Sequence, residues 1–169
     1  MLYITTYESK YIGLITIGSD GENLTGLWIG EEHFLKNNIN KIIETNDNLK
    51  VFALVKTWLK RYFDGKKTSI CGIPIKFQGT EFQNIVWKSL LDIPYGTSTT
   101  YRDIGRNVTK IMGKNTMSGQ AIGAAIGKNP ILIIVPCHRV ISIKGELRGY
   151  SAGIEYKEKL LKKEKIAYQ

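Results

Sequence analysis

The stretch TEFQNIVWKSLLDIPYGTSTTYRD, residues 80–103, decides the fold because it predicts a helical second half of the chain. Thr80 and Gln83 have the spacing of a capping box, in which two side chains cap each other's backbone N–H at a helix start. Pro94 and Gly96 end the helical pattern that follows. The apolar residues that recur at helical spacing between these signals are Phe82, Ile85, Val86 and Leu90.

Two more helices are predicted after this one. Thr100 and Asp103 repeat the capping-box spacing, and we expect a helix from Tyr101 to about Val108. After a connection that contains glycine and lysine, MSGQAIGAAIGKNP predicts a further helix. Two short helices joined by a loop favour a helix-turn-helix, although this loop is longer than the usual turn.

The last of these helices carries glycine at every fourth position, at Gly119, Gly123 and Gly127. Each glycine costs about 1 kcal/mol relative to alanine inside a helix, so the stripe indicates that something approaches this face closely. Either another helix packs tightly against it, or a DNA backbone or groove wall lies against it.

The first half of the chain is expected to be a small α+β unit. Its first 30 residues alternate and turn, which predicts three strands, at 2–9, 11–19 and 24–30. Apolar residues at helical spacing predict a helix over 51–63, ended by Gly65. Residues 66–79 are interpreted as a linker plus one strand, in which Cys71 is expected to be buried as a small apolar residue.

The segment VPCHRVI, residues 135–141, holds the strongest chemical signal. The apolar run from Ile131 to Val135 predicts a buried strand, which Pro136 ends because proline cannot donate a ladder hydrogen bond. Cys137 and His138 then follow a core strand, where side chains are held rigidly. A neighbouring base can generate the nucleophilic thiolate, but the pair alone is weak evidence and favours a structural cysteine.

A histidine that acts as a base needs a group that orients it. Glu164 lies three and four residues after Leu161 and Leu160, which should face the core, and it has no lysine four residues on. A carboxylate at a buried face requires a partner, and His138 is available. The alternative is that Glu164 belongs to a fraying helix end.

Composition limits the function classes. The net charge of +9 favours an anionic partner such as nucleic acid only slightly, because many of the lysines alternate with glutamates near the C-terminus, which is more often a solvated helix face. A four-ligand zinc site would need Cys71, Cys137, His33 and His138 to converge, because the chain has no other cysteine or histidine. No apolar run is long enough to span a membrane, and the N-terminus lacks a secretory pattern, so we expect a cytoplasmic protein.

Four segments together resemble the O6-alkylguanine-DNA alkyltransferases, also called methylated-DNA–protein-cysteine methyltransferases. The segments are GTEFQNIVWKSLLDIPYGTSTTY, MSGQAIGAAIGKNP, VPCHRVI and GELRGYSAG. The resemblance covers about residues 80–164. It implies an α+β fold, with a small N-terminal ribonuclease-H-like sheet domain at 1–78 and a mainly helical C-terminal domain with a helix-turn-helix at 79–169.

The resemblance also implies roles for single residues. Cys137 matches the alkyl acceptor, His138 the histidine that deprotonates it through a water, and Glu164 the carboxylate that holds this histidine. Asn129 matches an asparagine that braces the turn around the site. Tyr101 matches a tyrosine that hydrogen-bonds the guanine ring at N3, so that the base leaves as a neutral species.

Contacts to substrate and DNA are implied at further positions. Val140 matches a backbone carbonyl that contacts the base, Ser151 an N–H that contacts O6, and Tyr150 a pocket wall. Gly119 and Gly123 belong to the helix expected to meet DNA. Gln120 departs from the family, because many members carry an arginine there that intercalates where the flipped nucleotide was. Glutamine fills space without the charge-assisted contact.

The implied function is repair of O6-alkylguanine, and of O4-alkylthymine, in double-stranded DNA. The base is flipped and its alkyl group passes irreversibly to Cys137, once per molecule, with no cofactor and no metal. We expect a monomer without membrane contact. Two other functions remain as alternatives. One is a DNA-binding module whose thiol is inert, and the other is a cysteine hydrolase that uses Cys137, His138 and Glu164 and turns over repeatedly.

Overall fold

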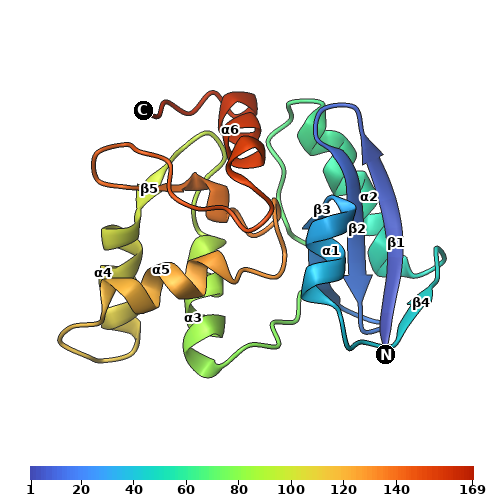
Figure 1. Ribbon diagram of the computed structural model, residues 1–169, viewed down its shortest axis with the longest axis horizontal. Coiled ribbons are helices and arrows are strands. Elements are labelled where there is room, and N and C mark those ends of the chain that lie inside the picture. The colour runs from blue at the N-terminus through green and yellow to red at the C-terminus, as the bar shows by residue number, and fades with distance from the viewer. The chain divides into compact units, whose positions relative to one another are not determined.

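The computed structural model describes residues 1–169 and divides into two compact units (Figure 1). One unit comprises Met1–Phe77 with Pro130–Leu132, and the other comprises Gln78–Asn129 with Ile133–Gln169. The α+β fold class predicted from the sequence is confirmed, since the first unit is built on a sheet and the second is mainly helical. None of the helices is both long and apolar enough to span a bilayer.

The first unit contains a four-stranded sheet in the order β3-β2-β1-β4. Its strands are β1 (Leu2–Ser9), β2 (Gly13–Ser19), β3 (Leu24–Ile29) and β4 (Ile43–Thr45). The first three run antiparallel, as the alternating sequence predicts, and β4 pairs parallel to β1 at the sheet edge. The short exposed strand β4 was not predicted, because three residues carry too little periodicity to be recognised.

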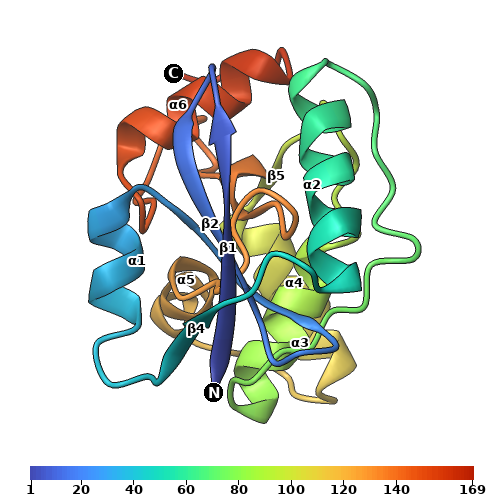
Figure 2. The same ribbon diagram turned by 90° about the vertical axis from the view of Figure 1, so that its right-hand side faces the viewer.

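Two helices contact this sheet (Figure 2). The predicted helix is α2 (Lys50–Phe63), which Gly65 follows with a positive φ of 79°. Its spacing buries one apolar face, and the rings of Trp58 and Tyr62 stack with centroids 5.3 Å apart. The other helix, α1 (Glu31–Asn37), was not predicted, since it spans only two turns.

Residues 66–79 form no strand, so this prediction is wrong. Ile75 makes a single bridge to Leu24, whose N–H donates to Pro74 O at 2.7 Å. Pro74 has no N–H of its own, which prevents a regular ladder. Cys71 is exposed rather than buried, because it lies in the turn before this bridge, next to Gly72 with a φ of 89°.

The apolar run Ile131–Val135 is buried but is not a strand, so the second strand prediction is also wrong. Ile131 bridges Leu27 within the first unit, and the backbone then turns. Ile133 has a φ of 69°, a left-handed conformation that no strand contains. A fully apolar run predicts burial but not conformation, because it has no alternation of polar and apolar residues that would distinguish a strand from a turn.

The second unit contains four helices, a 3₁₀ turn and two short strands. They are α3 (Glu81–Leu90), β5 (Thr99–Thr100), α4 (Tyr101–Ile111), α5 (Gly119–Gly127), η1 (Cys137–Arg139), β6 (Val140–Ile141) and α6 (Ile154–Lys163). Helices α3, α4 and α5 contact one another, and Trp87 Nε1 donates to Ala125 O at 2.8 Å between α3 and α5. The helix-turn-helix of α4 and α5 has the long connection that the sequence predicted.

The two predicted N-caps are present. Thr80 and Gln83 form the full reciprocal capping box at the start of α3. At α4, Thr100 Oγ1 accepts from Asp103 N at 3.1 Å, while the Asp103 carboxylate lies 3.8 Å from Arg106. Because β5 pairs parallel with β6, the first residue of α4 is held beside the end of η1. This pairing brings Tyr101 to the segment that carries Cys137.

Candidate active site

Cys137 lies in a tight turn that its sequence neighbours fix. Pro136 has φ −83° and ψ 59°, and Cys137 N donates to Val135 O at 2.8 Å, which is the geometry of an inverse γ-turn. Val135 O also accepts from Asn129 Nδ2 at 2.8 Å. Two hydrogen bonds to one carbonyl therefore hold the backbone that presents the thiol.

A buried polar cluster is built around His138 and Arg139, the two residues that follow Cys137. His138 Nε2 hydrogen-bonds the Glu164 carboxylate, and Arg139 Nε donates to the second carboxylate oxygen at 2.7 Å. Gly96 N donates to that same oxygen at 3.1 Å, while Arg139 Nη1 donates to Ile93 O at 2.7 Å. Sequence reasoning placed Glu164 at a buried face but missed Arg139, whose burial no spacing pattern marks.

The charges of this cluster are set by one another. Burial alone would raise the pKa of Glu164, but the hydrogen bond from His138 and the charge of Arg139 lower it to about 2. Burial lowers the pKa of His138 against the opposing effect of Glu164. A carboxylate that accepts at Nε2 keeps the proton there, so the lone pair is on Nδ1. His138 Nδ1 is buried and has no hydrogen-bond partner in the protein.

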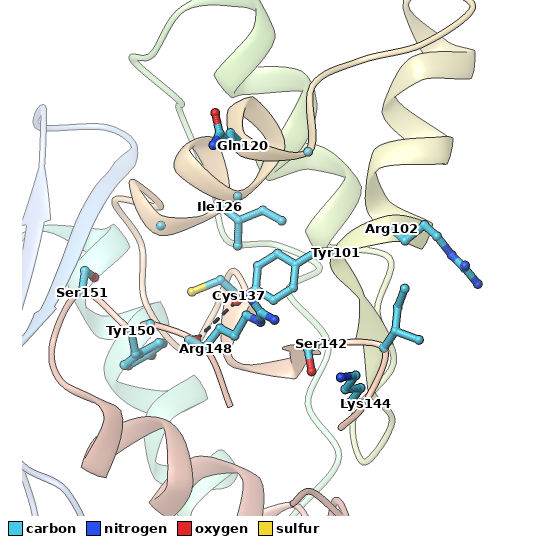
Figure 3. Close-up of a pocket in the computed structure, with 15 residues that line it drawn as sticks. Tyr101, Arg102, Gln120, Ile126, Cys137, Ser142, Lys144, Arg148, Tyr150 and Ser151 are labelled. Carbon is cyan, nitrogen blue, oxygen red and sulfur yellow. Dashed lines mark hydrogen bonds between the residues drawn. The ribbon is translucent and has the colours of Figure 1, made fainter. Parts of the chain in front are cut away.

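Cys137 also lines a cleft of about 860 Å³ that lies within the second unit (Figure 3). The lining residues come from α4, α5, η1 and the segment after β6: Tyr101, Arg102, Gly119, Gln120, Gly123, Ile126, Gly127, Cys137, Ser142, Ile143, Lys144, Arg148, Gly149, Tyr150 and Ser151. Cys137 is only 5% exposed. The thiol is therefore nearly buried at the wall of a cleft large enough for a purine.

The cysteine is not a resting thiolate. Burial raises the pKa of Cys137 to about 11, against a hydrogen bond from Asn129 and the charge of Lys157, which both lower it. A reaction at neutral pH must therefore remove the proton as the substrate binds.

Tyr101 is a polar group of the same cleft that lies near Cys137. Its Oη donates to Arg148 O at 3.3 Å (Figure 3). Burial, followed by the nearby Cys137, raises the pKa of Tyr101, so the phenol keeps its proton at neutral pH. The side chain can therefore donate a hydrogen bond to a bound molecule.

The predicted glycine stripe faces open space. A Cβ built on Gly119, Gly123 or Gly127 would meet nothing within 4 Å. The interpretation that another helix packs against these glycines is therefore wrong. Gln120 is exposed on the same helix and lines the same cleft.

Of the remaining predicted site residues, two line the cleft and one does not. Tyr150 and Ser151 line the cleft, but Val140 does not, and its carbonyl accepts from Lys157 Nζ at 2.8 Å. Lys157 is fully buried, although the charged sequence EYKEKLLKKEK is typical of a solvated helix. No three histidine, cysteine or acidic side chains gather to hold a metal ion, so the four candidate zinc ligands form no site.

Sequence profiles of two domains match the chain. The DNA binding domain of 6-O-methylguanine DNA methyltransferase matches residues 81–166, and the ribonuclease-like domain of the same protein matches residues 2–77.

Individual proteins match over nearly the whole chain. The methylated-DNA–protein-cysteine methyltransferase of Haemophilus influenzae is 37% identical over 99% of this chain and 88% of its own length. That of Methanosarcina acetivorans is 39% identical over 96% of this chain and 98% of its own. The crystal structure of Mycobacterium tuberculosis OGT in complex with DNA has a TM-score of 0.82 and 36% identity, covering 96% of this chain and 92% of that one.

Fold and site thus define the class of DNA-binding alkyl-transfer proteins that carry a cleft-lining cysteine beside a helix-turn-helix. The chain belongs to the 6-O-methylguanine DNA methyltransferase family. The resemblance found in the sequence is confirmed. The enzyme class predicted there, methylated-DNA–protein-cysteine methyltransferase, is the one that these curated relatives carry.

Proposed function

We propose that the protein repairs O6-alkylguanine in double-stranded DNA by moving the alkyl group to Cys137 Sγ, once per molecule. The observation that carries this proposal is the position of Cys137. Its side chain lines a cleft that the open glycine face of α5 also lines, and the next residue, His138, hydrogen-bonds the buried Glu164 carboxylate. O4-alkylthymine presents an equivalent alkylated oxygen and is proposed as a second substrate.

The proposed transfer balances without a cofactor. The thiol proton of Cys137 passes through a water molecule to His138 Nδ1, the ring nitrogen whose lone pair is available. The Sγ–C bond forms as the bond from the alkyl carbon to O6 breaks, and the electron pair of that bond stays on the guanine. The guanine gains the proton that the thiol has lost, and the protein keeps a thioether.

The leaving group is stabilised by Tyr101 in this proposal. Charge develops on the guanine ring as the bond to O6 breaks, and a hydrogen-bond donor aimed at N3 stabilises it. The phenol of Tyr101 is suited to this role for two reasons. Its raised pKa keeps the proton on Oη, and its side chain lines the same cleft as Cys137. The backbone groups of Val140 and Ser151 are proposed to orient the base.

The O6 atom of a paired guanine lies inside the base stack, so the nucleotide must be flipped out. Flipping costs a few kcal/mol and costs least for a lesion that pairs badly. Gln120, exposed near the start of α5, is proposed to fill the space that the nucleotide leaves. Its neutral side chain adds no charge-assisted contact to phosphate or base.

A basic surface supports the proposal that the partner is DNA. A second cleft runs along α4 and the connection to α5, and its charged residues are Arg102, Arg106, Lys110 and Lys114, all exposed. Cations on one helix and its adjoining loop attract a phosphate backbone without reading sequence. We propose a cytoplasmic monomer, since one nucleophile per chain needs no second subunit.

The proposal is tested by titrating the protein with a duplex oligonucleotide that contains one O6-methylguanine. We expect the amount of repaired guanine to equal the amount of protein and then to stop, with Cys71→Ala as active as the original chain. Continued turnover with excess lesion would favour a hydrolase-like reaction instead. Binding without any loss of the methyl group would favour a DNA-binding module with an inert thiol.

A further inference from the structure

The basic residues of the first unit are concentrated in one stretch of the chain. Residues 50–67, which comprise α2 and the start of the segment after it, carry five lysines and one arginine against a single acidic residue, Asp64. The rest of that unit carries seven acidic residues and four lysines. A lysine-rich composition would spread its charge over the whole unit, so the excess at α2 is a local feature that composition does not explain.

Four of these cations gather at the C-terminal end of α2. The apolar face of the helix is buried, whereas Lys60 and Arg61 are exposed in its last turn. Lys66 N donates to Arg61 O at 3.1 Å, which holds the start of the following segment against the end of the helix. Lys66 and Lys67 are both exposed, so the backbone keeps four positive side chains close together in solvent.

These four cations have no anionic partner in the protein. None of them makes an ion pair within 4.0 Å, and the ion pairs that do form lie elsewhere. Asp64, the one acid of this stretch, acts on Tyr7, where its charge adds to burial in raising the pKa of the phenol. Like charges that are held together repel one another, and a polyanion relieves that repulsion.

Aromatic rings lie at the same end of α2. Phe63, the last residue of the helix, packs against Tyr7 of β1 and against Tyr11, with ring centroids 6.4 Å apart in each pair. Tyr11 is 37% exposed, and Lys10 before it is exposed as well. Figure 2 shows the turn between β1 and β2, which carries both residues, at the same end of the unit as the last residues of α2. An exposed ring beside several cations provides a face on which an unpaired base can stack and charges for its phosphates.

We propose that this part of the first unit, the α2 surface, is a binding site for single-stranded DNA. Its members are Lys10, Tyr11, Lys60, Arg61, Lys66 and Lys67. The cations hold the phosphates without reading sequence, and a base stacks on the ring of Tyr11. A duplex keeps its bases stacked on one another, so only an unpaired strand can use the ring. The site goes beyond the proposed repair function, since it requires no alkylated base and shares no residue with the cleft of Cys137.

The same cations also have a purely structural explanation. Lys60 and Arg61 lie in the last turn of α2, where positive charge interacts favourably with the helix dipole. That explanation needs no ligand, and it predicts that removing the charges lowers stability without changing DNA binding. The test therefore measures both quantities on the same variants.

The test measures the affinity of the full chain for a fluorescent oligothymidine of about twelve nucleotides, by anisotropy at several salt concentrations. The variant Lys60→Gln/Arg61→Gln removes two charges from the α2 surface. Its matched control, Lys36→Gln/Lys41→Gln, removes two exposed lysines of the same unit in and after α1, which Figure 2 shows on the other side of β1 and β2 from α2. Tyr11→Ala removes the ring, and Tyr11→Phe keeps it.

We expect Lys60→Gln/Arg61→Gln to raise the Kd at least about fivefold at about 0.1 M salt, and to reduce the slope of log affinity against log salt by about 1.4. Lys36→Gln/Lys41→Gln should keep the original affinity and slope. Tyr11→Ala should raise the Kd at least about fivefold without changing the slope, because stacking is not ionic, and Tyr11→Phe should bind as the original chain does.

Three results would overturn the proposal. In the first, Lys60→Gln/Arg61→Gln lowers the unfolding free energy in urea but leaves affinity and slope unchanged, which would make the cations merely structural. In the second, the control pair weakens binding as much, so that net charge alone is responsible. In the third, vesicles that contain phosphatidylserine bind to the α2 surface while oligothymidine does not, which would assign the surface to a membrane. Because oligothymidine carries no alkylated base, each result is separate from the success or failure of transfer to Cys137.

Discussion

At the scale of single residues, Glu164 determines the state of the site. Its carboxylate accepts from His138, Arg139 and Gly96, so a single side chain holds the imidazole, a buried guanidinium and the loop before β5. The carboxylate fixes the His138 tautomer only while it is ionised. The same contacts that orient His138 therefore also contribute to folding stability.

The first prediction concerns the effect of the Glu164 carboxylate on stability at acidic pH. The pKa of Glu164 is about 2 in the folded protein against an ordinary 4.5, so the unfolded chain binds more protons between these values. Unfolding free energy should fall by about 3 kcal/mol as the pH drops through this window. The lowered pKa of His138 acts in the same direction, because the unfolded imidazole takes up a proton first.

Urea unfolding between about pH 2 and pH 7 measures this dependence. Glu164→Gln should be less stable at neutral pH by about 3–5 kcal/mol, since it leaves Arg139 without its anion, and its profile should be flatter. Glu155→Gln, on the exposed side of α6, should keep the original profile. An undiminished acid dependence in Glu164→Gln would assign the effect to another group.

The second prediction separates chemistry from binding at Cys137. Cys137→Ala removes the acceptor sulfur from the cleft wall and leaves the surface of α4 and α5 unchanged. We expect no measurable transfer, with affinity for lesion-containing duplex within about twofold of the original, measured by fluorescence anisotropy. Transfer that survives in this variant would show that the nucleophile is assigned to the wrong residue.

At the scale of secondary-structure elements, the glycines of helix α5 lower its intrinsic stability and leave one of its faces open. Gly123 lies mid-helix with nothing within 4 Å of a Cβ, so packing does not require glycine there. Its absence of a side chain keeps the path to the Cys137 cleft clear.

The third prediction follows from this open face. Gly123→Ala should raise the unfolding free energy by about 0.5–1 kcal/mol, because alanine is the better helix former and meets no neighbour. Gly123→Leu should fold equally well and bind duplex DNA at least about tenfold more weakly, since its side chain projects where the groove wall is proposed to lie. Undiminished DNA affinity in Gly123→Leu would place the DNA elsewhere.

The elements also show what the sequence could and could not predict. The hairpin, α2 and the two N-caps were predicted, because alternation, helical spacing and cap residues are local signals. The run from Ile131 to Val135 was predicted as a strand because it is wholly apolar, but only its burial is correct. The left-handed φ of Ile133 is imposed by tertiary structure and leaves no mark in the sequence.

The site was predicted in the same uneven way. Cys137, His138 and Glu164 were selected by residue type and by one helical spacing, and the structure brings His138 and Glu164 into contact. The burial of Lys157 was not predicted, since a lysine among alternating charges is indistinguishable from an exposed one until the fold shows its surroundings. Cys71 was placed in a strand that does not form.

At the scale of the whole molecule, the net charge of +9 becomes informative once its distribution is known. Several cations line the cleft along α4, where they would meet phosphates. Fields of this kind speed association with an anionic polymer and weaken as salt is added.

The fourth prediction concerns that salt dependence. Arg106→Gln should weaken DNA binding to a similar extent for damaged and undamaged duplex, and reduce the slope of log affinity against log salt by about 1. Lys162→Gln, exposed on α6 of the same unit and outside the lining of this cleft, carries the same loss of charge and should leave the slope unchanged. Equal slopes for both variants would show that the cleft makes no phosphate contact.

The central claim is that the sulfur of Cys137 receives the alkyl group. The most direct measurement is mass spectrometry of the peptides obtained after the protein meets a duplex containing O6-methylguanine. The account predicts one added methyl mass on the peptide that carries Cys137 and none on the peptide that carries the exposed Cys71. An unmodified Cys137 peptide at a molar excess of lesion would contradict it.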